Sequence, residues 1–343
     1  MNLRLRSIRL HSLGAFLLFS GLVSAAPLHA VGNMFRPLGT PAELVSELSI
    51  LTLVICAAVF LIVASLLVYA VIRFGHREGD SRSEPAQVYG SNQVEIAWTV
   101  IPILIVFVLA MSTARITSAI QDQRIPKDAV NVTVVGHQWW WEFRYTDLKF
   151  ATANELHVPL SSMAQPKLTL LTLNSADVAH GFWVPQLAGK TDVIPNRTNK
   201  MWIDPKELGT YLGNCSEYCG TQHAKMELRV VVETPEDFEK WVAEQQARAQ
   251  APESAENQRA FLTGACGACH TIGGTRAVGR TGPDLTHLMS RETLAATEVP
   301  LTAASLREWI ENPQKLKPGN KMPTVKLRDG QLDQIVAYLT TLR

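Results

Sequence analysis

The stretch Cys215–Met226, CSEYCGTQHAKM, places two of the chain's five cysteines four residues apart, followed by a histidine and a methionine. Thiolate, imidazole and thioether are soft ligands, and this set suits copper better than calcium, magnesium or manganese. Two cysteines on one loop can share their sulfurs between two copper ions, with His223 on one ion and Met226 on the other. The loop therefore predicts a dinuclear copper site that includes Cys215 and Cys219.

A copper site of this type needs a second histidine, and the candidate is His180 in the stretch SADVAHGFWVP. His180 falls at a predicted strand end, where ligands of sandwich proteins commonly arise. Zinc, a disulfide and a single copper ion remain alternatives for the two cysteines. Zinc motifs usually finish with further Cys or His, and methionine is a poor ligand for zinc, so copper is favoured.

A second pattern, CGACH at Cys266–His270, has the C-x-x-C-H form of covalent haem c attachment. The thiols of Cys266 and Cys269 add to the haem vinyl groups, and His270 becomes an axial ligand of the iron. A thioredoxin-like redox pair is the alternative, but it requires a preceding strand and no following histidine. The pattern therefore predicts a haem c site.

The other axial ligand of the iron is expected to be a methionine, since a histidine and methionine pair raises the reduction potential and suits electron transfer. Met322, in GNKMPT before the last predicted helix, is the favoured candidate. Met289 is the rival, but its surroundings, LTHLMSRE, are typical of a packed helix.

The two patterns lie in segments that predict different folds. Residues 125–235 contain short β-rich runs separated by Pro, Gly, Asn and Asp, which indicates an antiparallel sandwich or barrel. Residues 236–256 predict a helix that runs into a solvated linker. Residues 257–343 have helical periods and predict a small helical domain with a mildly basic surface.

Two long uncharged stretches precede these segments. Residues 48–72 hold no charge over 25 positions, and residues 96–114 hold none over 19. Each stretch is long enough to cross a bilayer as a helix. Residues 31–124 therefore predict a transmembrane hairpin with helices at about 46–73 and 95–115.

Residues 1–30 have the basic, apolar and small-residue order of a secretory signal peptide, with an uncleaved anchor as the alternative. Secretion, together with Arg73, Arg77 and Arg82, predicts that the loop between the helices is cytoplasmic and that everything after residue 115 is outside. That compartment is oxidising, so metal or covalent chemistry must protect the cysteine pairs. The net charge of +1 argues against a nucleic-acid partner.

Three stretches, CSEYCGTQHAKM, GHQWWWEFRYTD and LAGKTDVIPNR, together with the helix hairpin, resemble subunit II of cytochrome c oxidase over about residues 45–240. Residues 257–343 resemble a class I cytochrome c, including the stretch TGPDL. The resemblance implies a multidomain membrane protein. Its parts are a two-helix transmembrane hairpin, a cupredoxin-like antiparallel β-sandwich and an all-α cytochrome c domain.

The resemblance also assigns roles to the copper loop. In this family the dinuclear copper centre is called CuA, and the positions that match its side-chain ligands are His180, Cys215, Cys219, His223 and Met226. Glu217 supplies its backbone carbonyl as a further ligand. The Glu217 side chain is expected to help bind a magnesium or manganese ion at the contact with subunit I.

Two further residues match functional positions of the family. Trp139 matches the aromatic residue through which electrons reach the copper centre; the alternative is packing, and strand alternation sends Trp139 and Trp141 to one face and Trp140 to the other. Glu95 matches the residue near the mouth of a proton-uptake path. An ionisable group at a membrane boundary can equally be a solvated anchor.

The resemblance implies a subunit of a proton-translocating terminal oxidase in a bacterial inner membrane, with the copper and cytochrome c domains on the periplasmic side. Electrons from a cytochrome c or a cytochrome bc complex are expected to reach haem c, then the copper centre, then subunit I, where oxygen is reduced to water. Subunit III is a further expected partner. The alternative is a membrane-anchored electron-transfer protein that is not committed to an oxidase.

Overall fold

A computed structural model describes residues 32–75, 87, 89–121, 125–249 and 254–343 of the chain. The expected signal peptide, residues 1–30, lies outside the described residues, and so do Arg77 and Arg82. Residues Gly32–Arg343 form one compact unit.

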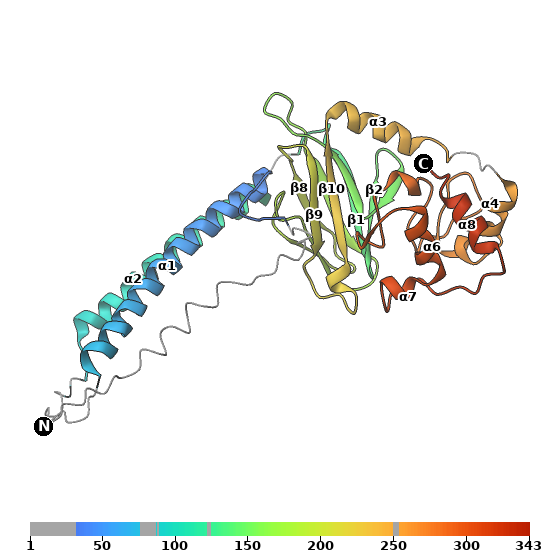
Figure 1. The fold of residues 1–343 in the computed structure, drawn as a ribbon. Helices are drawn as coiled ribbons and strands as arrows, with labels where there is room; N and C mark the ends of the chain where they lie inside the picture. The colour runs from blue at the N-terminus through green and yellow to red at the C-terminus, as the bar shows by residue number, and fades with distance from the viewer. Residues whose placement is uncertain (1–31, 76–86, 88, 122–124, 250–253) are drawn as a thin grey trace, which may run out of the picture. The chain divides into compact units, whose positions relative to one another are not determined.

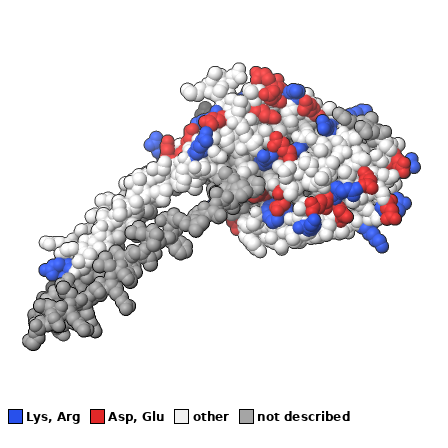
Figure 2. Space-filling model, viewed as in Figure 1, with Lys and Arg blue, Asp and Glu red and all other residues white. Residues whose placement is uncertain are grey.

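Two long helices come first, α1 (Thr40–Phe74) and α2 (Asn92–Gln121). Both are long and apolar enough to cross a membrane, with mean hydropathies of 3.0 and 2.4 over their most apolar windows. Figure 2 shows almost no charged side chains along this part of the surface. The two helices fit a membrane anchor, and both extend beyond the predicted bounds of 46–73 and 95–115.

The extra length arises at polar helix ends, which hydropathy does not mark. The Asp204 carboxylate accepts hydrogen bonds from the Thr40 amide and hydroxyl, at 2.7 and 2.6 Å, at the start of α1. Pro41 follows in the first turn, where a missing amide costs nothing. In the last turn of α2, the Ile120 carbonyl accepts a hydrogen bond from Trp202 Nε1 at 2.8 Å. Both anchoring residues belong to the next domain.

That domain is a β-sandwich of two five-stranded sheets (Figure 1). One sheet has the order β3-β2-β1-β5-β8, with β1 (Val130–His137), β2 (Trp140–Tyr145), β3 (Phe150–Ala153), β5 (Thr169–Ser175) and β8 (Asn199–Ile203). The other has the order β4-β10-β9-β6-β7, with β4 (Glu155–Pro159), β6 (His180–Trp183), β7 (Thr191–Val193), β9 (Gly209–Cys215) and β10 (Glu227–Glu233). The predicted sandwich is confirmed. It is not wholly antiparallel, because β1 pairs with β5 and β10 with β4 in parallel, and chain crossings of this kind leave no mark in the alternation of a single strand.

One face of β2 packs into the core between the sheets. Trp141, Phe143 and Tyr145 are fully buried. Trp141 and Phe143 both meet the ring of Phe182 edge on, at centroid distances of 5.5 and 6.5 Å. The spacing of two residues is that of a strand with one buried face. Trp139 lies in the turn before β2, so the predicted alternation does not extend to it.

A helix closes the open edge of the sandwich core. α3 (Pro235–Gln246) starts at Thr234, whose hydroxyl accepts a hydrogen bond from the Asp237 amide. Its inner face buries Phe238 and Trp241 against the sheets. The helix expected at the start of residues 236–256 thus packs onto the domain that precedes it.

The last domain is helical and has its own core. Its helices are α4 (Ala255–Leu262), α5 (Cys266–Cys269), α6 (Ala303–Glu311), α7 (Pro313–Leu316) and α8 (Gln331–Leu339). A two-stranded ladder of β11 (Thr293–Leu294) and β12 (Val299–Pro300) joins them. α4 therefore begins inside the segment 236–256 that was expected to be linker. The predicted helical class is confirmed.

Candidate copper and haem centres

The copper-site residues come from three neighbouring segments of the second sheet. Cys215 ends β9, and Met226 directly precedes β10, its antiparallel partner. The amide of Cys215 donates to the carbonyl of Met226 at 2.9 Å, which closes the loop between them. A one-turn helix, η1 (His223–Lys225), shapes that loop. His180 begins β6, which also pairs with β9, so sheet pairing brings it to the loop.

The ligand atoms expected for copper lie close together. Cys215 Sγ is 3.7 Å from Cys219 Sγ and 3.9 Å from His180 Nδ1. Cys219 Sγ is 3.7 Å from His223 Nδ1 and 3.8 Å from Met226 Sδ. Ligand atoms bound at about 2.0–2.3 Å to a tetrahedral metal lie roughly 3.5 Å from one another, so these spacings fit metal ions between them. The two cysteines are free thiols rather than a disulfide.

The carbonyl oxygen of Glu217 belongs to the same cluster. It lies 3.1 Å from Cys215 Sγ, while the rest of Glu217 is exposed at the surface. A backbone oxygen therefore faces the soft site and a carboxylate faces outward on the same residue. The carbonyl thus lies where a metal ligand is expected, and the role of the carboxylate as a ligand for a hard cation stays a prediction.

His180 is oriented by a residue that sequence reasoning missed. Its Nε2 donates to Asp177 Oδ1 at 2.8 Å, so Nδ1 faces the sulfurs. Metal-binding histidines commonly hold a carboxylate on the ring nitrogen that does not bind metal. Burial alone raises the pKa of Asp177, but hydrogen bonds from His180 and from the amides of Gln138 and Val178 outweigh it and hold the pKa below its usual value. The spacing Asp-x-x-His was the available signal.

Two glycines make room for this arrangement. A Cβ atom on Gly136 would lie 2.8 Å from the His180 ring, and one on Gly181 would overlap the Ser216 hydroxyl and lie 3.0 Å from the Glu217 amide. Ordinary carbon contacts are about 3.5–4.0 Å, so neither position accepts a side chain without displacing the copper site. Neither glycine was singled out from sequence.

When no metal is bound, the pKa values of the two thiols are shifted in opposite directions. The hydrogen bond from Cys219 lowers the pKa of Cys215 to about 3. The same contact, together with burial, raises the pKa of Cys219. One thiolate is therefore present before any metal arrives, and thiolate is the form that binds metal.

Trp139 contacts the copper-ligand cluster and also lines a cavity. Its indole Nε1 donates to the Cys219 carbonyl at 3.1 Å, and Gln138 Nε2 donates to the same carbonyl at 2.8 Å. Both residues also line a cavity of about 420 Å³ in the helical domain. Trp140 lines the cavity as well and stacks on His137 at a centroid distance of 4.2 Å.

All four residues expected to hold haem c line that cavity: Cys266, Cys269, His270 and Met322. Much of the remaining lining is apolar and includes Phe261 on α4, Ile310 on α6 and Leu339 on α8. The rival ligand Met289 is not among the lining residues and packs against the domain's core cluster instead. The geometry therefore favours Met322 as the second iron ligand.

His270 is held in the tautomer that a metal requires. Its Nδ1 lies 2.8 Å from the carbonyl oxygen of Pro283, which can only accept, so Nδ1 carries the proton and Nε2 keeps its lone pair. Burial lowers the pKa of His270, which favours the neutral ring. Gly282 lies against the ring, where a Cβ would approach His270 Cε1 to 2.6 Å.

The cavity also contains a buried cation that was missed from sequence. Arg291 lines it, and the buried Nε has no hydrogen-bond partner among the described residues. Its other end donates to the Asp284 carbonyl at 2.5 Å. A buried guanidinium without a carboxylate partner is costly, and a haem propionate would supply such an acceptor. The residues present therefore fit the group that the C-x-x-C-H pattern implies.

Glu95 lies far from both centres. It stands in the first turn of α2, and its side chain is exposed. At 1.5 Å per residue, it is roughly 38 Å along the helix from Ile120, where α2 meets the sandwich. This exceeds the thickness of a bilayer's hydrocarbon core, about 30 Å, so Glu95 lies at the opposite boundary of the hairpin.

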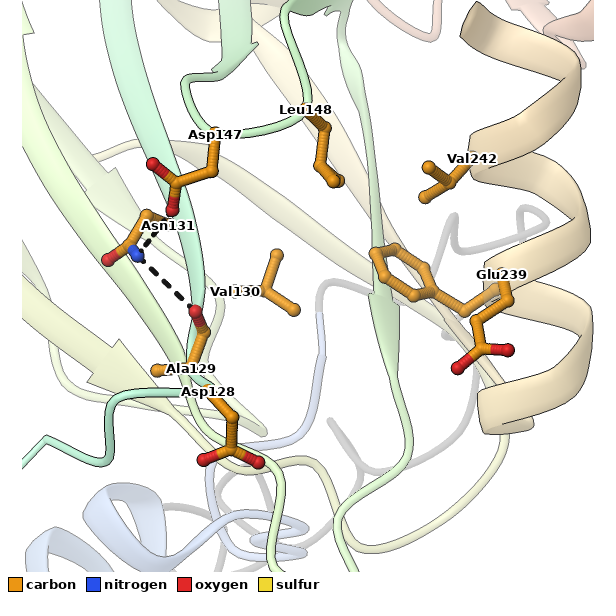
Figure 3. A pocket seen from close by; sticks show the side chains of 9 residues that line it. Asp128, Ala129, Val130, Asn131, Asp147, Leu148, Glu239 and Val242 are labelled. Carbon is orange, nitrogen blue, oxygen red and sulfur yellow. Dashed lines mark hydrogen bonds between the residues drawn. The ribbon is translucent and has the colours of Figure 1, made fainter.

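A smaller cavity of about 250 Å³ lies between the start of β1 and α3 (Figure 3). Asp128, Asp147 and Glu239 surround an apolar floor that includes Val130 and Val242. It contains no cysteine, histidine or methionine, so it is separate from the copper and haem centres.

A membrane hairpin, a sandwich with a soft-metal loop and a cytochrome c domain define a membrane-anchored electron-transfer protein. Family models support each part. Residues 31–116 match cytochrome c oxidase subunit II, transmembrane domain; residues 163–234 match cytochrome c oxidase subunit II, periplasmic domain; residues 254–343 match cytochrome c. The chain belongs to the cytochrome c oxidase subunit II family, with a fused cytochrome c domain.

Curated relatives extend over most of the chain. Cytochrome c oxidase subunit 2 of Alkalihalophilus pseudofirmus is 32% identical, covering 90% of this chain and 90% of that protein. Cytochrome c oxidase subunit 2 of a Bacillus species is 33% identical, covering 79% of this chain and 80% of the relative. The periplasmic domain of subunit II of cytochrome oxidase from Bradyrhizobium japonicum is 30% identical, covering 36% of this chain and 97% of that one, with a TM-score of 0.33.

Proposed function

We propose that this subunit accepts electrons at its own haem c and passes them through dinuclear CuA to subunit I, where oxygen is reduced to water with proton translocation. When bound, the two groups supply the one-electron redox chemistry, and the protein holds and orients them. Trp139 is the observation that carries the proposal, because its indole contacts the carbonyl of Cys219 and also lines the haem cavity. Trp139 is the residue where electrons reach the copper centre.

The metal ligands follow from the cluster. His180, Cys215, Cys219, His223, Met226 and the carbonyl of Glu217 would hold two copper ions, which would supply one-electron redox chemistry. The Glu217 carboxylate contributes to a magnesium or manganese site shared with subunit I. Cys266 and Cys269 hold the haem, with His270 and Met322 as the iron ligands.

The surroundings follow from the family. The helices α1 and α2 lie in a bacterial inner membrane, and the two redox domains face the periplasm. Subunit III completes the membrane complex, and the electron donor is a cytochrome c or a cytochrome bc complex. Glu95, at the far boundary of the hairpin, stands at the mouth of a proton-uptake path.

Metal content tests the assignment directly. The full chain purified alone in detergent is expected to contain two coppers and one iron by elemental mass spectrometry. Replacing His180 with alanine is expected to lower copper and leave iron unchanged, because the two ligand sets share no residue. Zinc in place of copper, or a single copper, would contradict the dinuclear assignment.

Electron flow tests the role of Trp139. In the assembled oxidase, Trp139→Phe is expected to slow transfer from haem c to copper by about tenfold or more, since it removes the indole contact with Cys219. Trp140→Phe is the matched control, because Trp140 lines the same cavity and its ring stacks on His137. Equal effects of the two substitutions would remove Trp139 from the path. Purification of the chain without a large haem-bearing subunit would favour a free carrier instead.

A further inference from the structure

A buried lysine joins the two redox domains. Lys317, directly after α7, is only 3% exposed. Its ammonium donates to three carbonyl oxygens: Trp139 at 2.9 Å, Lys225 at 2.7 Å and Ala295 at 3.0 Å. Two of these carbonyls belong to the copper domain, one on the proposed electron path and one on the copper loop. All three ammonium hydrogens are therefore used, with no carboxylate involved.

A buried glutamate makes the reciprocal contact. Glu155, on β4 of the copper domain, is 2% exposed. Its carboxylate accepts from the amides of Glu292 and Thr293, at 3.0 and 2.8 Å, and from the Thr293 hydroxyl at 2.6 Å. These donors belong to the cytochrome domain and directly follow Arg291, which lines the haem cavity. Each domain thus inserts one charge into backbone groups supplied largely by the other.

The segment that carries Lys317 also reaches the haem iron site. Pro318, the next residue, accepts a hydrogen bond from the side chain of Gln222 in the copper loop. Met322, the proposed iron ligand, lies five residues after Lys317. The stretch 317–322 therefore contacts the copper loop at one end and supplies an iron ligand at the other.

We propose that Lys317 and Glu155 form an interdomain latch that keeps the fused cytochrome docked on the copper domain, and that Lys317 is a positioning residue for electron transfer between the two centres. This inference rests on the proposed function. It goes further by naming the contacts that set the distance between the centres. The latch also keeps the chain's own cytochrome domain over Trp139, so a soluble donor reaches haem c rather than the copper centre.

Burial gives these two contacts their weight. Other charge pairs across the interface are partly exposed, such as Lys321 with Asp177 and Arg229 with Glu292. Exposed pairs contribute little and are screened by salt. Removing one partner of a buried charged contact leaves desolvated groups unpaired, which is far more costly. The buried latch, rather than these exposed rim pairs, is expected to hold the domains together.

Amine labelling of the assembled oxidase tests the latch without any electron transfer. With an acetylating reagent and mass spectrometry, Lys317 is expected to be at least about tenfold less modified than Lys315, which is 67% exposed and pairs within its own domain. Glu155→Gln is expected to loosen the interface at Glu292 and Thr293 and raise labelling of Lys317. Glu239→Gln, an exposed acid of the same domain, is the matched control. Equal labelling of Lys317 and Lys315 in the unaltered protein would overturn the latch.

The positioning role is tested by laser-triggered reduction of haem c. Lys317→Met keeps a similar length and removes the ammonium, and it is expected to slow transfer to copper by about tenfold or more. Lys315→Met carries the same charge change and is expected to leave the rate unaltered. The unaltered protein is expected to transfer electrons at a rate independent of salt, whereas Lys317→Met makes the rate depend on salt as rim pairs take over.

The outcomes are separable. An unchanged rate in Lys317→Met, with normal haem and copper spectra, would overturn the positioning role. A Glu155→Gln protein that leaves Lys317 protected would overturn the reciprocal latch. Absence of any transfer from haem c to copper in the unaltered protein would overturn the proposed function, and the labelling experiment would still decide the latch.

Discussion

The copper domain and the cytochrome domain hold their cofactor residues in different ways. In the sandwich, Met226 is fully buried and Cys215 is 2% exposed within a described core cluster of 25 residues, and His180 is fully buried beside them. The described core of the cytochrome domain has 12 buried residues arranged around a 420 Å³ cavity. In the copper domain, packing of the core positions the ligand cluster. In the cytochrome domain, the cofactor residues line a cavity instead.

This difference means that the two domains depend on their cofactors to different degrees. Sheet pairing and buried rings place the copper ligands, so removal of metal is expected to leave the sandwich's core intact. The cytochrome domain needs the haem to fill its cavity and to pair Arg291, and small domains bury too little surface to lose that contribution. Substitutions in each domain test this contrast.

The largest effect is expected from loss of the haem. Replacing Cys266 and Cys269 with alanine removes the covalent attachment of the haem. Because the haem binds only the folded domain, its loss is expected to lower the free energy of unfolding of the cytochrome domain by about 4 kcal/mol or more. The sandwich should keep its own melting transition and its copper. Calorimetry of the full chain, with near-ultraviolet circular dichroism, separates the two transitions. Simultaneous loss of both would show that the sandwich also relies on haem.

A smaller loss is expected inside the sandwich from Tyr145→Phe. The buried Tyr145 hydroxyl donates to the His157 carbonyl at 2.7 Å and accepts from the His157 amide at 2.9 Å. Removing it leaves two buried backbone groups unpaired, at about 1–3 kcal/mol. Denaturant unfolding followed by tryptophan fluorescence measures the change. The copper spectrum should stay unaltered, because Tyr145 contacts none of the copper ligands.

Met226→Leu separates metal binding from packing. Leucine conserves the volume of this fully buried side chain, so the sandwich is expected to lose less than about 1.5 kcal/mol. The copper absorption and electron paramagnetic resonance signals are expected to change, since the thioether is gone. An unchanged copper signal would remove Met226 from the ligand set.

The smallest effect is expected at a helix end of the cytochrome domain. The Thr302 hydroxyl accepts from the Ser305 amide at 3.1 Å, and the Ser305 hydroxyl accepts from the Thr302 amide at 2.9 Å, a capping box at the start of α6. Thr302→Ala is expected to cost about 1 kcal/mol in the cytochrome transition alone. A shift of the sandwich transition instead would contradict the independence of the two cores.

Local patterns were predictable from sequence, and long-range ones were not. The copper loop and the CGACH motif carry residue type and spacing within a few positions, so both were readable directly. His180 was found only because the site lacked a ligand, since the pairing of β6 with β9 brings it to the loop. The role of Asp177 as its hydrogen-bond partner was missed although the spacing Asp-x-x-His is local.

Lys317 shows the limit most clearly. In the stretch KLKPGNK it resembles any solvated basic segment, and nothing local distinguishes it from Lys315. Its burial depends on carbonyls from residues 139 and 225, which only the folded chain brings together. Helix bounds had a similar limit, since the start of α1 depends on Asp204, far along the chain.

The anchors on the two helices have a mechanical consequence. Asp204 holds the start of α1 and Trp202 holds the end of α2, and both residues lie on one side of the same sandwich. Because both helices are attached to the same sandwich, rotation of the sandwich about the axis of either helix is restricted. The hairpin is therefore expected to fix the orientation of the copper loop relative to the membrane plane, and the latch at Lys317 and Glu155 extends that orientation to the cytochrome domain.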